Sequence, residues 1–292
     1  MLMKRIYHSR RSAMAGITKD TVLAIGNKIR RSDKTCSKHP KCHLVYLDGV
    51  AKIKPFCPAC VQQGNIKQQE QMLSNLKEKE TRGYLKGQSL VDRDEVFTYT
   101  FDNFKTKDNS PEAVLKGKAR LIAGLYLKEP YQKSNSLLYG NAGAGKTHLA
   151  MAMLNAVNDN ADPMVRCLFI SVNKLIREMK NWFNDKTSLW SPKHVTDVVS
   201  KANLVVLDDL GAESATGTAT SFVQDTIFDI YESNQRIITT TNLSMDELYS
   251  TYHSRLVSRM QEGYGGKVID FTKVQDKRPF IGGANGSSDR LG

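Results

Sequence analysis

Short apolar runs recur along the last two-thirds of the chain, separated by stretches of helical length. Each run is short enough to be one strand, and its apolar residues are mostly consecutive instead of alternating with polar ones. Such runs are typical of parallel strands buried on both faces, and strands that alternate with helices predict a layer of helices on each side of a sheet. The sequence therefore predicts a three-layer α/β domain. The runs are residues 137–139, 166–171, 204–207, 236–241 and 267–271.

The first third of the chain has a different pattern. Residues 62–86 are rich in Gln, Lys and Glu with few apolar positions, which predicts a solvated helix that leads into a linker near 83–87. Upstream, apolar runs at 44–47 and 50–56 flank an Asp-Gly pair that favours a hairpin turn. The expected divisions are a basic N-terminal domain (1–65), a helical linker (66–94), the α/β domain (95–281) and a flexible Gly- and Ser-rich tail (282–292).

The positive charge is concentrated near the N-terminus. The formal net charge is +12, and residues 1–90 hold 18 Lys and Arg against 6 Asp and Glu, whereas residues 91–292 hold 24 of each. A basic segment suits contact with nucleic acid or another acidic partner, or only the solubility of a small domain, and both interpretations stay open. With no apolar run of membrane-spanning length and no secretory signal pattern, we expect a cytoplasmic protein with no membrane partner.

The most specific motif is a phosphate-binding loop that follows the first apolar run. It has the pattern G-x-x-x-x-G-K-[ST], with a strand expected before it and a helix after it. Glycines let the backbone N–H groups turn toward phosphate oxygens, the lysine contacts the β- and γ-phosphates, and the threonine hydroxyl can ligate Mg²⁺. The motif predicts a site for ATP and Mg²⁺. The expected nucleotide-binding residues are Gly140, Asn141, Ala142, Gly143, Ala144, Gly145, Lys146, Thr147 and His148.

Carboxylates follow the third apolar run, and an amide follows the fourth. Asp208 and Asp209 come directly after 204–207, and Asn242 comes after 236–241. In open α/β sheets, ligands bind at the carboxyl ends of the strands. We therefore expect Asp208 to hold Mg²⁺ with Thr147, Asp209 to orient the attacking water, and Asn242 to reach the γ-phosphate. Asn242 could instead cap the helix that follows it.

Two arginines lie four residues apart in a helical segment downstream. Arg255 and Arg259 share one face of that helix. A guanidinium inserted into a neighbouring subunit's nucleotide site would stabilise the charge of the transition state. We expect at least one of the two arginines to have this role, the alternative being that both are solvated surface residues.

Four of the five cysteines lie within one 25-residue window. Cys36-x₂-His39 and Cys57-x₂-Cys60 form two matched pairs of potential ligands, with Cys42 and His43 as surplus candidates. Pairs with x₂ spacing are typical of closed tetrahedral Zn²⁺ sites, and four protein ligands favour a structural role. The sequence predicts a zinc site formed by Cys36, His39, Cys57 and Cys60.

Aromatic residues gather in two places outside these motifs. Three lie at 99–104, where packing against the ATPase domain is the favoured interpretation and contact with adenine is the alternative. Trp182, Phe183 and Trp190 lie near lysines, so they could stack on bases of single-stranded nucleic acid or belong to the core.

In combination, these motifs resemble the AAA+ ATPases of the helicase-loader family typified by the bacterial DnaI and DnaC proteins and their phage relatives. The similarity covers about residues 95–280, and the cysteine and histidine cluster resembles the DnaI type. The segments that carry it are 101–104 (Phe-Asp-Asn-Phe), 140–147, 207–213 (Leu-Asp-Asp-Leu-Gly-Ala-Glu), 240–244 (Thr-Thr-Asn-Leu-Ser) and 254–259 (Ser-Arg-Leu-Val-Ser-Arg).

The resemblance implies an ATPase that loads a DnaB-type replicative helicase onto single-stranded DNA and assembles on that helicase. It implies that the N-terminal domain grips the helicase, that Asn242 is sensor 1, that Arg259 before Arg255 is the arginine finger, and that Arg278 is sensor 2. Two alternatives stay open: an IstB-like transposition ATPase, and a nucleotide-gated adaptor or inhibitor of the helicase. Asp209 stands where Glu is commoner, so hydrolysis is expected to be slow and stimulated by the partner.

Overall fold

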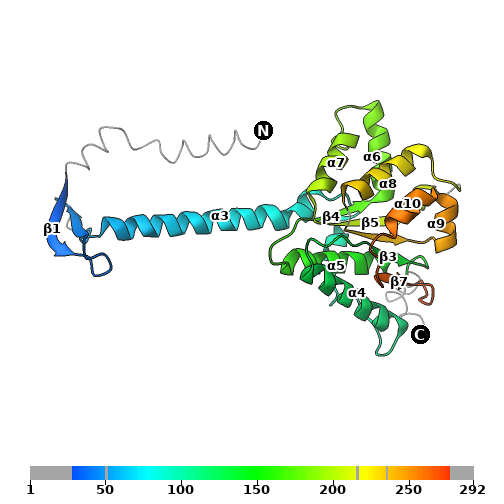
Figure 1. The fold of residues 1–292 in the computed structure, drawn as a ribbon, viewed down its shortest axis with the longest axis horizontal. Coiled ribbons are helices and arrows are strands. Elements are labelled where there is room, and N and C mark those ends of the chain that lie inside the picture. The colour runs from blue at the N-terminus through cyan, green and yellow to red at the C-terminus, as the bar shows by residue number, and fades with distance from the viewer. Residues whose placement is uncertain (1–27, 50–51, 215–216, 235, 277–292) are drawn as a thin grey trace, which may run out of the picture. The chain divides into compact units, whose positions relative to one another are not determined.

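The computed structural model describes residues 28–49, 52–214, 217–234 and 236–276 (Figure 1). The chain divides into two compact units, Met1–Leu76 and Lys77–Gly292. The expected tail, 282–292, lies outside the described residues. None of the helices in the described part is long and apolar enough to cross a membrane.

The first unit is built on a two-stranded antiparallel sheet. Strand β1 (Ile29–Thr35) pairs with β2 (His43–Leu47), and Ile29 lies opposite Leu47. The segment 36–42, with two of the expected zinc ligands, makes the reversal between the strands, and the Cys36 N–H donates to the Cys42 carbonyl at 2.9 Å. The expected hairpin of 44–47 with 50–56 is confirmed only as one antiparallel bridge, from Val45 to Phe56, because the ladder of β2 is formed with β1.

Helix α3 (Pro58–Gln88) begins in the first unit and ends in the second. Its apolar residues in the first unit are exposed, 66% for Leu73, which confirms a solvated helix there. The expected linker near 83–87 is wrong, because the helix continues through Gly83 and Gly87. Glycine in a helix costs only about 1 kcal/mol, and burial of Leu85 in the core of the second unit opposes that cost.

The second unit has a five-stranded parallel sheet in the order β4-β5-β6-β3-β7, as the apolar runs predicted. The strands are β3 (Ser136–Tyr139), β4 (Cys167–Ser171), β5 (Leu204–Leu210), β6 (Ile237–Thr241) and β7 (Val268–Asp270). The helices are α4 (Pro111–Lys128), α5 (Lys146–Asn160), α6 (Val172–Asn184), α7 (Pro192–Lys201), α8 (Ser221–Ser233), α9 (Met245–Thr251) and α10 (Ser254–Met260), with short 3₁₀ helices η1 (Asp94–Thr98) and η2 (Ala212–Ser214).

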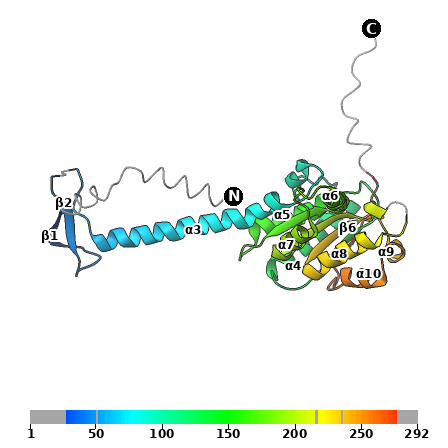
Figure 2. The same ribbon diagram turned by 90° about the horizontal axis from the view of Figure 1, so that it is seen from above.

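Helices cover both faces of this sheet (Figures 1 and 2). Alternate residues of β5 point to opposite faces: Val205 and Leu207 join one core with α6 to α10, and Leu204 and Val206 join the other core with α4 and α5. Both sets are fully buried. The three-layer α/β prediction is confirmed, and the carboxyl ends of β3, β5 and β6 lie at one edge of the sheet because the three strands are parallel neighbours.

Candidate nucleotide and metal sites

The phosphate loop requires glycine at positions where the backbone is both left-handed and crowded. Gly140 has φ +123°, and a Cβ there would lie 2.6 Å from the backbone nitrogen of Thr272. Gly145 has φ +95° at the N-cap of α5, and a Cβ there would lie 2.6 Å from the ring of Phe104. Any other residue would be strained at both positions. The loop is held from outside by Asn141, whose side-chain amide donates to carbonyls of the segment after β7 at 2.8 and 2.9 Å.

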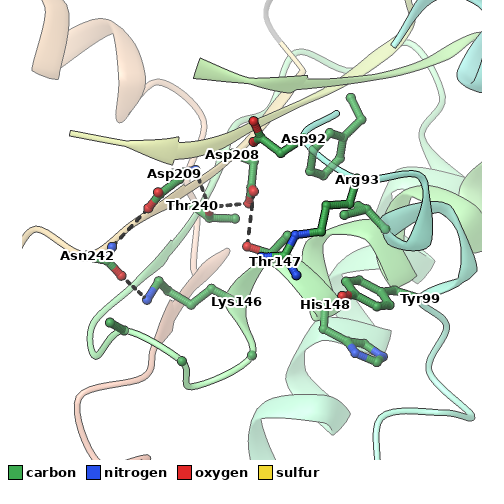
Figure 3. Close-up of a pocket in the computed structure, with 15 residues that line it drawn as sticks. Asp92, Arg93, Tyr99, Lys146, Thr147, His148, Asp208, Asp209, Thr240 and Asn242 are labelled. Carbon is green, nitrogen blue, oxygen red and sulfur yellow. Dashed lines mark hydrogen bonds between the residues drawn. The ribbon is translucent and has the colours of Figure 1, made fainter. Parts of the chain in front are cut away.

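Lys146 lies at the centre of the loop and is 6% exposed. Its ammonium donates to the carbonyls of Gly140 at 2.8 Å and Asn141 at 2.7 Å. It also donates to the side-chain oxygen of Asn242 at 2.6 Å (Figure 3). The bond to Asn242 links the loop that follows β3 with the residue that follows β6, and these two strands are neighbours in the sheet. The predicted lysine and the predicted amide therefore meet.

Asp208 and Thr147 also lie together, on the side of Lys146 that is away from Asn242 in Figure 3. The Thr147 hydroxyl donates to one oxygen of Asp208 at 3.2 Å, and the Thr240 hydroxyl donates to the other at 2.7 Å. Burial disfavours the charged carboxylate and raises the pKa of Asp208 to about 6, although both hydrogen bonds oppose this shift. Cis ligands of an octahedral Mg²⁺ ion are about 3 Å apart, so the oxygens of Thr147 and Asp208 fit that ion.

Asp209 is turned away from Asp208 by a local irregularity. Strand β5 continues to Leu210 and therefore includes both aspartates, which were expected to follow the strand. Its pairing with β6 shifts between Leu207 and Leu210, and Asp209 has φ +59°. The Asp209 carboxylate consequently accepts from the side-chain amide of Asn242 at 3.0 Å. Asn242 is not the cap of the next helix, because Ser244 caps α9 in a capping box with Glu247.

A pocket of about 620 Å³ contains these groups and has a second wall, of which the sequence analysis had considered Tyr99 alone. Arg93, Val96 and Tyr99 form this wall, from the segment at and around η1. His148 lines the pocket as predicted, and its ring stacks on Tyr99 with the centroids 4.4 Å apart and the planes at 3°. Its Nε2 lies 2.8 Å from the side-chain oxygen of Asn103, and burial lowers its pKa.

At 99–104 the packing interpretation is confirmed for Phe104, and contact with adenine stays a prediction. Phe104 is 6% exposed and packs against Gly145, as the packing interpretation has it. Tyr99 packs against the same core and also lines the pocket. No signal in the sequence pointed to Arg93, because a single arginine after an Asp has no distinguishing pattern.

The two candidate finger arginines do not line this pocket. Arg259 makes ion pairs with Glu232 at 2.5 Å and with Glu262 at 2.8 Å. The Arg255 guanidinium lies 4.4 Å from the centroid of the Phe228 ring. Both arginines border a separate surface hollow of about 590 Å³ on α8 and α10. Arg278, the expected sensor 2, lies outside the described residues.

The predicted zinc ligands converge in the first unit. The ligand atoms of Cys36, His39, Cys57 and Cys60 all lie within 4.8 Å of one another. The His39 Nδ1 atom is 3.3 to 3.8 Å from the three sulfurs, and the Cys36 and Cys60 sulfurs are 3.6 Å apart. A tetrahedral Zn²⁺ ion requires about 3.8 Å between sulfurs and about 3.5 Å from sulfur to nitrogen. The donor set and spacing therefore fit Zn²⁺.

The two surplus candidates are placed differently. His43 is directed elsewhere, with its Nδ1 atom 3.0 Å from the carbonyl of Ser32. The Cys42 sulfur lies 3.4 Å from that of Cys57, at the border of the cluster.

Comparison with known proteins gives one family and several relatives. The family described as the bacterial DnaA ATPase domain matches residues 96–266. The chromosomal replication initiator protein DnaA of Thermosipho africanus is 28% identical over 179 residues, which are 60% of this chain and 37% of that protein. DnaA of Francisella philomiragia is 29% identical over 185 residues, which are 61% of this chain and 34% of that protein.

Solved structures with a similar fold include two from the helicase-loader group. The DnaC helicase loader has a TM-score of 0.48 and 21% identity, over 63% of this chain and all of that one. DnaI has a TM-score of 0.49 and 24% identity, over 62% of this chain and 95% of that one. The chain spans less than half the length of these curated DnaA relatives.

Proposed function

We propose, since the chain belongs to the family of the bacterial DnaA ATPase domain, that it is a nucleotide-driven switch acting at the start of DNA replication. The family match makes the second unit an AAA+ ATPase domain, as the motifs predicted, and ATP is the nucleotide for the phosphate loop. The observation that supports a switch is the chain of contacts from Lys146 through Asn242 to Asp209. A γ-phosphate bound at Lys146 would alter both hydrogen bonds, and the change would reach Asp209 in β5.

Each group in the pocket has a role that its position supports. Lys146 would contact the β- and γ-phosphates, and Thr147 with Asp208 would hold Mg²⁺, which supplies charge neutralisation for the phosphates. Asp209, held by Asn242, would accept a hydrogen bond from the attacking water and orient it in line with the γ-phosphate. Arg93 and Tyr99 would form the side of the pocket that receives the base and ribose. These assignments predict that Lys146→Ala loses ATP binding, whereas Asp209→Asn retains binding and loses hydrolysis.

We propose that the partner is a DnaB-type replicative helicase and that the switch loads it onto single-stranded DNA in the cytoplasm. The single observation that carries this choice is the four-ligand cluster in a unit of its own before the ATPase unit. An IstB-like transposition ATPase would need the same ATPase core but offers no role for these ligands. The basic N-terminal region would supply charge complementary to an acidic surface of the helicase.

Single-stranded DNA would contact the end of α6. The Lys186 ammonium lies 3.5 Å from the ring centroid of Trp182, and the adjacent Phe183 is 50% exposed. A half-buried tryptophan and an exposed phenylalanine beside a cation offer aromatic faces on which bases can stack. Trp190 packs against the core instead, so the stacking role is assigned to Trp182 and Phe183 alone. Arg259 or Arg255 would act as the finger in a neighbouring subunit's site.

The test is light scattering after size exclusion of the full chain with the replicative helicase of its host, with ATP and with ADP. We expect a complex whose stability depends on the nucleotide. Cys60→Ser should lose the complex and keep ATP binding, and Lys146→Ala should keep the complex and lose its response to ATP.

A helicase-unwinding assay on a forked DNA then separates a loader, which raises the unwinding rate, from an inhibitor, which lowers it. No complex in either nucleotide would refute helicase loading and leave the ATPase assignment intact.

A further inference from the structure

Strand β5 ends in a backbone turn that holds two left-handed residues within three positions. Asp209 has φ +59° and Gly211 has φ +103°. The Asp209 N–H donates to the hydroxyl of Thr240 on β6 at 2.9 Å. The Gly211 N–H donates to the carboxylate of Glu213, in η2, also at 2.9 Å. A residue other than glycine is strained in the left-handed region and stays there only where its surroundings hold it. The conformation of Asp209 therefore depends on contacts such as these.

The Glu213 carboxylate is itself held in place. It is half-buried, and its second oxygen accepts from the hydroxyls of Tyr252 and Ser214. Tyr252 is 2% exposed and is the C-cap of α9. Burial and the neighbouring carboxylate raise the pKa of Tyr252, so its hydroxyl keeps the proton that it donates. Glu213 forms no ion pair within the described residues, and its partners are therefore this buried tyrosine and the turn after β5.

The turn decides where the Asp209 side chain points. Side chains alternate between the two faces of a regular strand, and Val205 and Leu207 face the core that contains α6 to α10. Regular alternation would place Asp209 on that face as well. Leu210 takes that place instead. The Asp209 carboxylate lines the pocket and accepts from the side-chain amide of Asn242 at 3.0 Å (Figure 3).

We infer that Glu213 is a positioning residue for ATP hydrolysis, which holds the turn at Gly211 and through it the carboxylate of Asp209. The inference rests on the role that the proposed function gives to Asp209, the orientation of the attacking water. Glu213 is not among the described residues that line the pocket, so it acts without touching the nucleotide. A misplacement of about 1 Å can cost about 100-fold in rate. Glu213 therefore governs the turnover number and not the affinity for ATP.

The experiment measures ATP hydrolysis by the full chain at saturating Mg²⁺, with labelled ATP so that slow turnover is resolved. Glu213→Ala removes the acceptor of the Gly211 N–H, and we expect kcat to fall by at least about tenfold with KM unchanged within about twofold. Glu213→Gln keeps a neutral acceptor there and should retain kcat within about threefold of the unchanged protein. An unchanged kcat in Glu213→Ala, or a loss that appears only in KM, would overturn the inference.

A second background separates positioning from other effects of the substitution. In Asp209→Asn no carboxylate is left to position, so adding Glu213→Ala should change the residual kcat by less than about twofold. Tyr252→Phe removes only the outer anchor and should lower kcat less, with the same dependence on Asp209. This variant carries the test if Glu213→Ala does not fold. Full additivity with Asp209→Asn for both variants would refute a role through Asp209.

Glu247 provides a matched control in the same unit. It is an exposed carboxylate that accepts from the Ser244 N–H at 2.7 Å in the capping box of α9. Glu247→Ala likewise leaves a backbone N–H without its carboxylate, but this N–H is far along the chain from Asp209. The control should lower the melting temperature and leave kcat of the folded protein unchanged. A loss of kcat equal to that in Glu213→Ala would assign both effects to stability and overturn the inference.

Asp209→Asn alone distinguishes a failure of this inference from a failure of the proposed function. If Asp209→Asn hydrolyses ATP at the unchanged rate, the role proposed for Asp209 is refuted, and the inference about Glu213 is refuted with it. If Asp209→Asn loses hydrolysis and Glu213→Ala does not, only the inference about Glu213 is refuted.

Discussion

The hydroxyl of Thr240 offers a direct test of how the pocket is held together. It donates to the buried Asp208 carboxylate at 2.7 Å and accepts from the Asp209 backbone N–H at 2.9 Å. Thr240→Val keeps the shape and removes both bonds. A hydrogen bond to a charged group is worth about 1.5–3 kcal/mol, and a buried N–H left without an acceptor costs about 1–3 kcal/mol. We therefore expect the free energy of unfolding to fall by about 3 kcal/mol.

The neighbouring threonine provides a matched control. Thr241 is also fully buried on β6, and its hydroxyl donates to the Leu210 carbonyl at 2.6 Å and accepts from the Leu243 N–H at 3.1 Å. Thr241→Val loses the same number of bonds but touches neither aspartate side chain. It should destabilise the protein by about 2 kcal/mol, since its partners are neutral.

The two variants should differ in hydrolysis. Loss of a residue that orients a metal ligand costs about 10- to 100-fold in activity, so ATP turnover at saturating Mg²⁺ and ATP should fall by that factor in Thr240→Val. It should change less than about twofold in Thr241→Val. Urea unfolding would first define a temperature at which both variants are folded. Equal turnover in the two variants would refute the role given to Thr240 and, with it, the placement of Asp208 as a metal ligand.

Three other features can be tested in the same way. The purified chain should contain about one zinc per molecule by mass spectrometry, lost in Cys57→Ser and retained in Cys42→Ser; retention in the first would contradict the ligand set. Gly140→Ala adds a Cβ 2.6 Å from a backbone nitrogen at φ +123° and should weaken ATP binding in calorimetry by at least about tenfold, whereas Gly217→Ala, at φ +121° in open space, should be strained and bind normally. Arg236→Leu removes a buried guanidinium that donates to three backbone carbonyls and should lower the unfolding free energy by about 3 kcal/mol, with unchanged ATP affinity in the folded protein.

The features that could be predicted from the sequence are those encoded in contiguous residues. The phosphate loop is one, because its glycines, lysine and threonine are adjacent and the strand and helix on either side are strongly patterned. The cluster of Cys36, His39, Cys57 and Cys60 is another, since two x₂ pairs almost define a tetrahedral arrangement of ligand atoms. The parallel sheet followed from apolar runs that had no polar alternation.

The features that were predicted wrongly or not at all depend on contacts between segments that are distant in the sequence. The partner of β2 was set by the turn at 36–42, which brings β1 back beside it, and not by the local Asp-Gly pair. Helix α3 continued through its glycines because Leu85 is buried in a core made by other segments. Arg93, in the second wall of the pocket, escaped notice for the same reason: it lines the pocket only after η1 has packed beside α5, whereas Tyr99 was among the aromatic residues with adenine contact as an alternative.

The hydrogen bonds of Lys146 also bear on selectivity among anions. Its ammonium already has three acceptors supplied by the protein. An incoming phosphate therefore competes with these acceptors. Binding is favoured only by the difference in free energy between the new bonds of Lys146 to phosphate and the bonds to protein that they replace. Inorganic phosphate or sulfate offers one anionic group to the N–H groups of the loop, whereas a triphosphate engages them through several phosphates at once and so outweighs the loss. After hydrolysis the same acceptors compete again for Lys146, and this competition favours departure of the cleaved phosphate.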